Sequence, residues 1–213
     1  MQGSYEAFVR NHPIEAGRTA LIVIDVQNWV FGEQARAANP YFQHRLDDLV
    51  LPNLQRLIGA ARETGAEVMY TVIENLTRDG RDRSLDYKIS GIFVAKGSWE
   101  AKVVDAIAPA DDDIVLAKTS SSLFNSTNCD YLLRNLGIEH LIVAGLLTDQ
   151  CVDHTIRDAA DRGYRAICVP DACATLSAEQ HESALSLFAG YCRTLTTDDV
   201  IAELRQASRA GAR

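Results

Sequence analysis

The sequence predicts one doubly wound α/β domain with a six-stranded, mainly parallel sheet. Apolar runs rich in β-branched residues recur along the chain, and segments of helical periodicity separate them. This alternation is typical of a parallel sheet whose crossover helices cover both faces. We found no internal repeat, linker or low-complexity segment. We therefore expect a single Rossmann-like, three-layer domain over residues 1–213, with an N-terminal extension at 1–17 and a flexible tail at 207–213.

The strands are predicted from short apolar runs such as "TALIVIDV" and "HLIVAG". In order, they are expected at 19–26, 66–73, 113–119, 140–145, 164–172 and 192–197. The helices are expected at 48–64, 98–107, 126–136, 151–162, 177–190 and 198–206. Glycine follows or ends several of these helical segments, as helix C-termini prefer. The exception is the polar segment 74–97, which is long for a connection in this fold and is expected to shape a site.

Composition excludes several classes of partner. The net charge of -8 disfavours nucleic acid and anionic membranes. No run approaches the roughly 20 apolar residues of a membrane helix, and the N-terminus lacks the plan of a secretory signal. Five cysteines, odd in number and without a CxxC pair, fit a reducing compartment. We therefore expect a cytoplasmic protein whose partner is a small molecule.

Three polar residues follow or end apolar strands and suggest chemistry at one edge of the sheet. They are Asp25 after "ALIVI", Lys118 after "DIVLA", and Cys151 in "GLLTDQCVDHT". Ligands of open parallel sheets bind beyond the carboxyl ends of the strands. A thiol beside a lysine and near a helix N-terminus is activated for attack, and a carboxylate there can accept its proton.

Each of the three residues also has an ordinary structural interpretation. Cys151 resembles a small packing residue, Asp25 a turn or helix cap, and Lys118 an exposed lysine at a strand end. It is the coincidence of all three that favours catalysis.

At these residues the sequence resembles the isochorismatase-like cysteine hydrolases, which include nicotinamidases and the N-carbamoylsarcosine, ureidoacrylate and biuret hydrolases. The resemblance runs from "TALIVIDVQNWVF" through "KTSSSLFNSTNCDYLL" to "GLLTDQCVDHT" and beyond. It implies that Asp25, Lys118 and Cys151 form a catalytic triad and that the thiol attacks a carbonyl. It also implies a cis peptide bond between Leu146 and Leu147, with the N–H groups of Leu147 and Cys151 as the oxyanion hole.

The resemblance disfavours a typical nicotinamidase. Nicotinamidases of the family carry an Asp-x-His-x-His metal site after the second strand, and the equivalent segment here, "YTVIENLTRDGRDRS", has no histidine. We therefore expect no catalytic metal and no cofactor. His154, three residues after Cys151, is expected to be structural.

Further residues are candidates for binding the substrate. Paired hydrogen bonds from a guanidinium suit a carboxylate or ureido oxygen, and apolar walls suit a small planar amide. The candidates are Trp29, Phe31, Glu74, Arg78, Arg83, Tyr87 and Phe124. For the charged segment that holds both arginines, a solvated loop is an equally good interpretation.

The function predicted is metal-independent hydrolysis of the C–N bond in a small amide, carbamoyl or ureido compound through a covalent acyl-enzyme. Two alternatives stay open: isochorismatase activity, which cleaves a vinyl ether, and a non-catalytic binding domain that keeps the fold. A nucleotide-binding Rossmann enzyme is discounted because no G-x-G-x-x-G motif follows the first strand. The resemblance also implies a homodimer or homotetramer.

Overall fold

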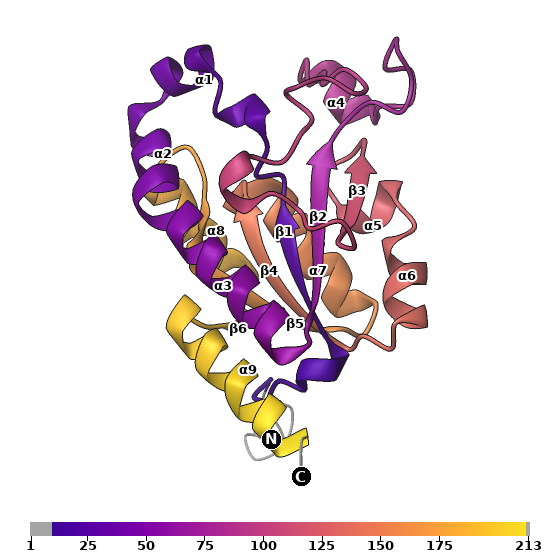
Figure 1. The fold of residues 1–213 in the computed structure, drawn as a ribbon. Coiled ribbons are helices and arrows are strands. Elements are labelled where there is room, and N and C mark those ends of the chain that lie inside the picture. Colours follow the sequence, from indigo (N-terminus) through magenta and orange to yellow (C-terminus); the bar gives the residue numbers. More distant parts are fainter. Residues whose placement is uncertain (1–9, 212–213) are drawn as a thin grey trace, which may run out of the picture.

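The computed structural model describes residues 10–211 and contains a six-stranded, all-parallel sheet in the order β3-β2-β1-β4-β5-β6 (Figure 1). The strands are β1 Thr19–Ile24, β2 Glu67–Ile73, β3 Ile114–Lys118, β4 His140–Leu146, β5 Arg165–Ala174 and β6 Arg193–Thr194. The α/β fold class and all six strands expected from the sequence are confirmed. The central strands β1 and β4 are buried over their whole length, as expected of apolar strands with helices on both faces.

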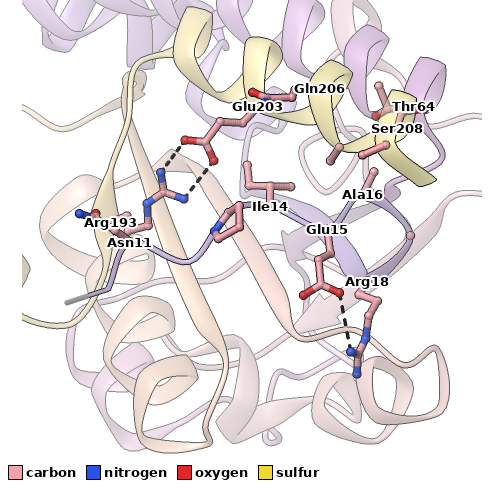
Figure 2. Close-up of a pocket in the computed structure, with 14 residues that line it drawn as sticks. Asn11, Ile14, Glu15, Ala16, Arg18, Thr64, Arg193, Glu203, Gln206 and Ser208 are labelled. Atoms are coloured by element: carbon pink, nitrogen blue, oxygen red, sulfur yellow. Dashed lines mark hydrogen bonds and ion pairs between the residues drawn. The ribbon is translucent and has the colours of Figure 1, made fainter. Parts of the chain in front are cut away.

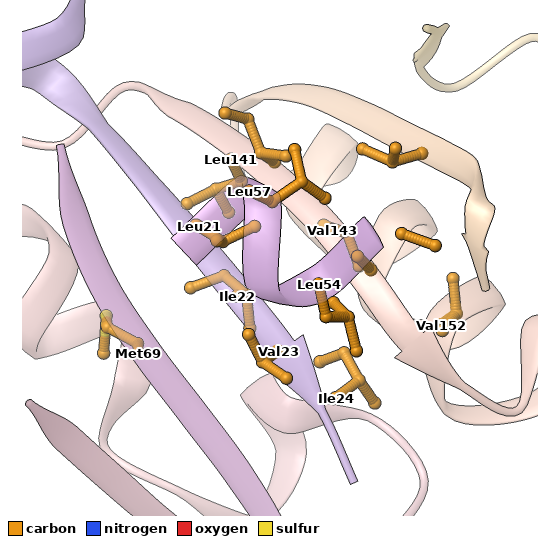
Figure 3. Close-up of a cluster of buried hydrophobic side chains, with 14 of the residues drawn as sticks. Leu21, Ile22, Val23, Ile24, Leu54, Leu57, Met69, Leu141, Val143 and Val152 are labelled. Carbon is orange, nitrogen blue, oxygen red and sulfur yellow. The ribbon is translucent and has the colours of Figure 1, made fainter. Parts of the chain in front are cut away.

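Helices cover both faces of the sheet. They are α1 Glu33–Ala38, α2 Pro40–Arg45, α3 Leu51–Thr64, α4 Leu85–Ile89, α5 Leu123–Ser126, α6 Cys129–Asn135, α7 Asp153–Asp161, α8 Ala178–Phe188 and α9 Thr197–Gly211. The helices α3 and α9 lie together on one face, and α7, with α5 and α8 beside it, lies on the other. Leu54 and Leu57 of α3 lie among the buried side chains of β1 and β4 (Figure 3). None of the described helices is both long and apolar enough to cross a bilayer.

The helix expected at 98–107 does not form. Backbone hydrogen bonds tie this segment to the chain beyond β1: the N–H of Asn28 donates to the carbonyl of Lys102, and the N–H of Val104 donates to the carbonyl of Val26. Val103 also forms an isolated antiparallel bridge with Gln27. Residues 99–102 form a turn closed by the N–H of Lys102 and the carbonyl of Trp99, the long-range bonds hold residues 102–104 against the chain beyond β1, and a 3₁₀ turn at Asp105–Ile107 follows.

The last helix is longer than expected. It continues to Gly211, so residues 207–211, expected to belong to a flexible tail, are helical. The end of that tail and the first nine residues of the expected N-terminal extension lie outside the described residues. Sequence periodicity also gave no indication of α1, α2 or α4, which are only five or six residues long.

Gly145 allows β4 to pass unusually close to β1. Its φ is 124°, and an added Cβ would lie 2.2 Å from the carbonyl oxygen of Ile24. We expect Gly145→Ala to lower the free energy of unfolding by about 3 kcal/mol or more, because backbone atoms cannot move aside as a flexible side chain can. Urea unfolding measures this change, with Gly59→Ala as the control, since a Cβ there meets no atom within 4 Å. Equal stability of the two variants would contradict the expectation.

Candidate active site

Asp25 begins the site directly after β1. Its φ of 53° is left-handed, a conformation that aspartate adopts more readily than most residues. Its N–H donates to the backbone carbonyl of Thr71, at 3.1 Å, and the Thr71 hydroxyl donates to Oδ1 of Asp25, at 2.6 Å. Oδ2 accepts no hydrogen bond from a hydroxyl or backbone N–H of the described residues, and it faces the ammonium of Lys118. The carboxylate is thus held by one oxygen and presents the other.

Lys118 ends β3 and is fully buried. Its Nζ lies 2.9 Å from Oδ2 of Asp25, 3.0 Å from the carbonyl oxygen of Ser120 and 3.1 Å from the hydroxyl of Tyr87. Burial by itself lowers the pKa of this lysine, but the charge of Asp25 is the main influence that raises the pKa, and the net effect is a pKa above its usual value. Lys118 is therefore an ammonium ion at neutral pH.

Cys151 lies in a single π-helical turn, Thr148–Val152, between β4 and α7. Its Sγ is 3.3 Å from Nζ of Lys118 and 3.8 Å from the hydroxyl oxygen of Tyr87. Burial, reinforced by the charge of Asp25 and opposed by that of Lys118, raises the pKa of the Cys151 thiol to about 11. The resting group at neutral pH is therefore a thiol.

The chain between β4 and Cys151 is held in an unusual conformation. The peptide bond between Leu146 and Leu147 is cis, as the resemblance implied. Among the described residues, the N–H of Leu147 has no acceptor. The next side chain, Thr148, is buried, and its hydroxyl lies 2.9 Å from Nδ1 of His181, whose pKa burial lowers to about 4. A neutral histidine thus anchors the turn that carries the thiol.

A small pocket of about 150 Å³ opens above the three residues. Its polar lining consists of Asp25, Tyr87, Gln150 and Cys151. The other lining side chains are two aromatic residues, Trp29 and Phe42, and the aliphatic residues Val30, Ile73, Ile92, Leu146, Leu147 and Leu176. Cys151 is only 5% exposed, and its side chain lines this pocket.

The aromatic candidates from the sequence separate into two groups. Trp29 and Tyr87 line the pocket. Phe31 is not among the lining residues, and its ring packs against the main core. Phe124 is also outside the pocket lining, because it is buried against Tyr164, with ring centroids 5.8 Å apart.

The charged candidates do not line the pocket either. Glu74 accepts a hydrogen bond from the N–H of Gly97, at 2.6 Å. Arg83 donates to the carbonyl oxygens of Gly80 and Ile92, so it braces the segment behind the pocket wall. Arg78 is exposed. The long segment 74–97 therefore contributes Tyr87 and Ile92 to the pocket, whereas none of its arginines lines it.

Sequence reasoning missed Thr71, although a signal for it existed. Thr71 is a small polar residue inside the apolar run of strand β2, at the position paired with Ile24, the residue before Asp25. Phe42 and Leu176 carried no such signal, because only the folding of distant segments brings them to the pocket. His154 lies outside the pocket and contacts the carbonyl of Gln150, in keeping with a structural role.

Two other groups of residues lie away from this pocket. A larger pocket, of about 820 Å³, lies between the segment that precedes β1 and α9, but its charged groups are paired, Arg193 with Glu203 and Arg18 with Glu15 (Figure 2). Among the described residues, one grouping has the spacing of metal ligands: Glu15, Glu139 and His140. Both glutamates are already paired with arginines at the start of the strands, at the opposite end of the sheet from Cys151.

Several curated proteins are similar to this chain. It is 29% identical over 194 residues to the isochorismatase of Bacillus subtilis, covering 91% of this chain and 60% of that protein. It is 32% identical to a ureidoacrylate amidohydrolase of Serratia proteamaculans, covering 72% of this chain and 68% of that protein. It is 35% identical to an N-carbamoylsarcosine amidase of Arthrobacter, covering 70% of this chain and 57% of that protein. The chain thus spans less than two thirds of the length of two of these relatives.

The fold has a counterpart of similar size among solved structures. A cysteine hydrolase from Pseudomonas syringae superposes with a TM-score of 0.82 at 30% identity, covering 92% of this chain and 97% of the other. The family model described as "Isochorismatase domain" matches residues 19–199, which include all six strands and the three residues of the site. From this match and the shared fold we conclude that the chain belongs to the isochorismatase domain family.

Proposed function

We propose that this protein is a cysteine hydrolase that cleaves the C–N bond of a small amide, carbamoyl or ureido compound. The observation that carries the proposal is the position of the Lys118 ammonium, 2.9 Å from a carboxylate oxygen of Asp25 and 3.3 Å from the sulfur of Cys151, below a pocket. A base, a cation and a thiol in one buried cluster are the groups that nucleophilic catalysis needs. Two of the relatives are amidases by name.

The first half of the reaction transfers the acyl group to sulfur. Asp25 takes the thiol proton of Cys151 on Oδ2, the oxygen that Thr71 does not occupy, as the sulfur attacks the substrate carbonyl. Lys118 stabilises the developing thiolate, since its charge lowers the pKa of the thiol. The N–H groups of Leu147 and Cys151 serve as donors to the oxyanion. Asp25 then returns the proton to nitrogen, so the C–N bond breaks and ammonia or an amine leaves.

The second half consumes water. Asp25 removes a proton from a water molecule that attacks the thioester, and the sulfur leaves as a thiol when the proton is returned. For a primary amide the net reaction is amide plus water to carboxylic acid plus ammonia. No group beyond Asp25, Lys118, Cys151 and the backbone donors is required.

The alternative functions are isochorismatase activity and a non-catalytic binding domain. The isochorismatase relative keeps the first open, but a thiol already placed beside the ammonium of Lys118 favours amide cleavage over hydrolysis of a vinyl ether. A panel of amides and ureides assayed for ammonia, with isochorismate assayed for pyruvate, separates the two. Ammonia release that depends on Cys151 supports the proposal, pyruvate release alone favours isochorismatase, and neither product favours the binding domain.

The raised pKa of Cys151 predicts a pH dependence for its alkylation. Because the thiolate fraction below the pKa grows with pH, we expect the rate constant with iodoacetamide to rise about tenfold per unit from pH 7 to pH 10. Peptide mass spectrometry measures it for each cysteine. Cys151 should react before the other four, since they are buried and do not line this pocket. A rate that is already constant below pH 8 would show a preformed thiolate and contradict the expectation.

A further inference from the structure

The pocket above Cys151 has no basic side chain among the described residues that line it. Asp25 is the one acidic group in the lining, and the rest is aliphatic or aromatic apart from Tyr87, Gln150 and Cys151. A site that selects a carboxylated substrate normally presents an arginine or lysine to it. The charges of the lining residues therefore indicate which charge a substrate can carry in this pocket.

Lys118 and Arg83 contact residues that line the pocket, and both are bound to other partners. Lys118 is below the pocket, fully buried, and its ammonium contacts Asp25, Cys151, Tyr87 and a backbone carbonyl. Arg83 is bound to the carbonyl of Ile92, one of the wall residues. Neither Lys118 nor Arg83 is therefore free to pair with a substrate carboxylate in this pocket.

Arg45 is also bound to other groups. It contacts His181, the histidine that holds the turn carrying Cys151. Its guanidinium donates to the carbonyl oxygens of Cys173 and Pro170 and contacts Nε2 of His181 at 3.0 Å. It does not line the pocket. Its guanidinium therefore links α2 to β5 and α8.

The size of the pocket limits the group that it accepts. A cavity of 150 Å³ with walls of leucine, isoleucine and phenylalanine is known to hold a molecule of about six carbon atoms. The pocket here has a comparable volume and similar apolar walls, although it is open to solvent rather than closed. It suits a substrate with a compact branched or planar apolar group, positioned so that the carbonyl carbon of the substrate reaches the sulfur.

We propose that the substrate is an uncharged amide or carbamoyl compound with a compact apolar group and without a carboxylate. The inference rests on the proposed function and narrows it. Ureidoacrylate and N-carbamoylsarcosine, the compounds in the names of two relatives, both carry a carboxylate. A carboxylate in this pocket would lose hydrating water molecules without gaining a cation from the lining, which costs free energy.

A matched pair of substrates tests the inference. The amide 4-methylpentanamide and the anion succinamate have the same shape, because an isopropyl group in one replaces the carboxylate of the other. We expect kcat/KM for ammonia release to be higher for the neutral amide by about 100-fold or more, the size of effect seen when a charge is buried without a partner. The Cys151→Ala variant supplies the blank.

One substitution should change this preference. Leu176 lines the pocket and is 45% exposed, so arginine can be accommodated there and can reach a substrate carboxylate. We expect Leu176→Arg to reduce the preference for the neutral amide by about tenfold or more through a new charge-assisted hydrogen bond. Leu187→Arg is the matched control, because Leu187 is also exposed but does not line this pocket, and its ratio should equal that of the wild type.

The outcomes separate this inference from the proposed function. Hydrolysis of succinamate that depends on Cys151 and is as fast as that of 4-methylpentanamide overturns the inference and leaves the proposed function standing. If neither compound releases ammonia, the proposed hydrolysis is not supported for these two compounds. The inference about charge is then tested by how well each compound protects Cys151 from iodoacetamide. Protection by the neutral amide at a concentration about tenfold or more below that of succinamate supports it; equal or better protection by succinamate overturns it.

Discussion

Replacing Cys151 by alanine is expected to abolish hydrolysis, with a loss in kcat of at least about 10⁴-fold, because the proposed acyl-enzyme forms on the sulfur of this residue. The fold should survive, since the change removes one sulfur atom that faces the pocket and costs about 1 kcal/mol in unfolding free energy. Ammonia release and urea unfolding, measured on the same preparations, check both statements.

Cys129→Ala is the control for this experiment. Cys129 is a fully buried thiol whose pKa burial raises to about 12, and it does not line the pocket. Its replacement should lower stability and leave kcat close to that of the wild type. Turnover that survives in Cys151→Ala would remove the covalent mechanism, whereas equal loss in both variants would indicate damage to the fold.

Lys118→Met is expected to reduce the free energy of unfolding by about 3–5 kcal/mol, in addition to abolishing activity. The reason is that Asp25 stays behind as a buried carboxylate with only Thr71 as a hydrogen-bonding side-chain partner. The pKa of Cys151 should also rise further, because Lys118 is the cation that lowers it. Alkylation of Cys151 at pH 8 should accordingly be slower than in the wild type.

The double variant Asp25→Asn/Lys118→Met provides the decisive comparison. Removing both charges eliminates the unpaired ion, so most of the lost stability should return while activity stays absent. Urea unfolding of the wild type, both single variants and the double variant gives the coupling energy directly. A double variant that is as unstable as the sum of the single variants would show that the two residues act independently.

Much of this fold and site was predictable from the sequence, because the strongest signals are local. Buried parallel strands form continuous apolar runs, and the polar residue that ends such a run, as Asp25 and Lys118 do, is visible in the sequence. The position of Cys151 after β4 followed from the same pattern. The convergence of these three residues depends on the sheet order β3-β2-β1-β4-β5-β6, which was not predicted; the sequence indicated only that the ends of parallel strands share one edge of the sheet.

The pocket wall was predicted less well, for a physical reason. Whether a side chain in an irregular segment faces the pocket depends on which partners it finds, and Arg83 finds backbone carbonyls within its own loop. Polar residues near a site attract attention in a sequence, whereas wall residues such as Phe42 and Leu176 look like any other apolar residue. The homo-oligomeric state and the cytoplasmic location stay predictions.

The position of β3 in the sheet has a consequence for inactivation. As the outermost strand next to β2, it is held on one side only, and its Val115 is 45% exposed. It nevertheless carries the ammonium on which the thiol depends. If β3 frays at this edge, the ammonium of Lys118 separates from the sulfur of Cys151 while the central strands stay paired. Mild heat or denaturant should therefore abolish activity before the circular dichroism signal changes.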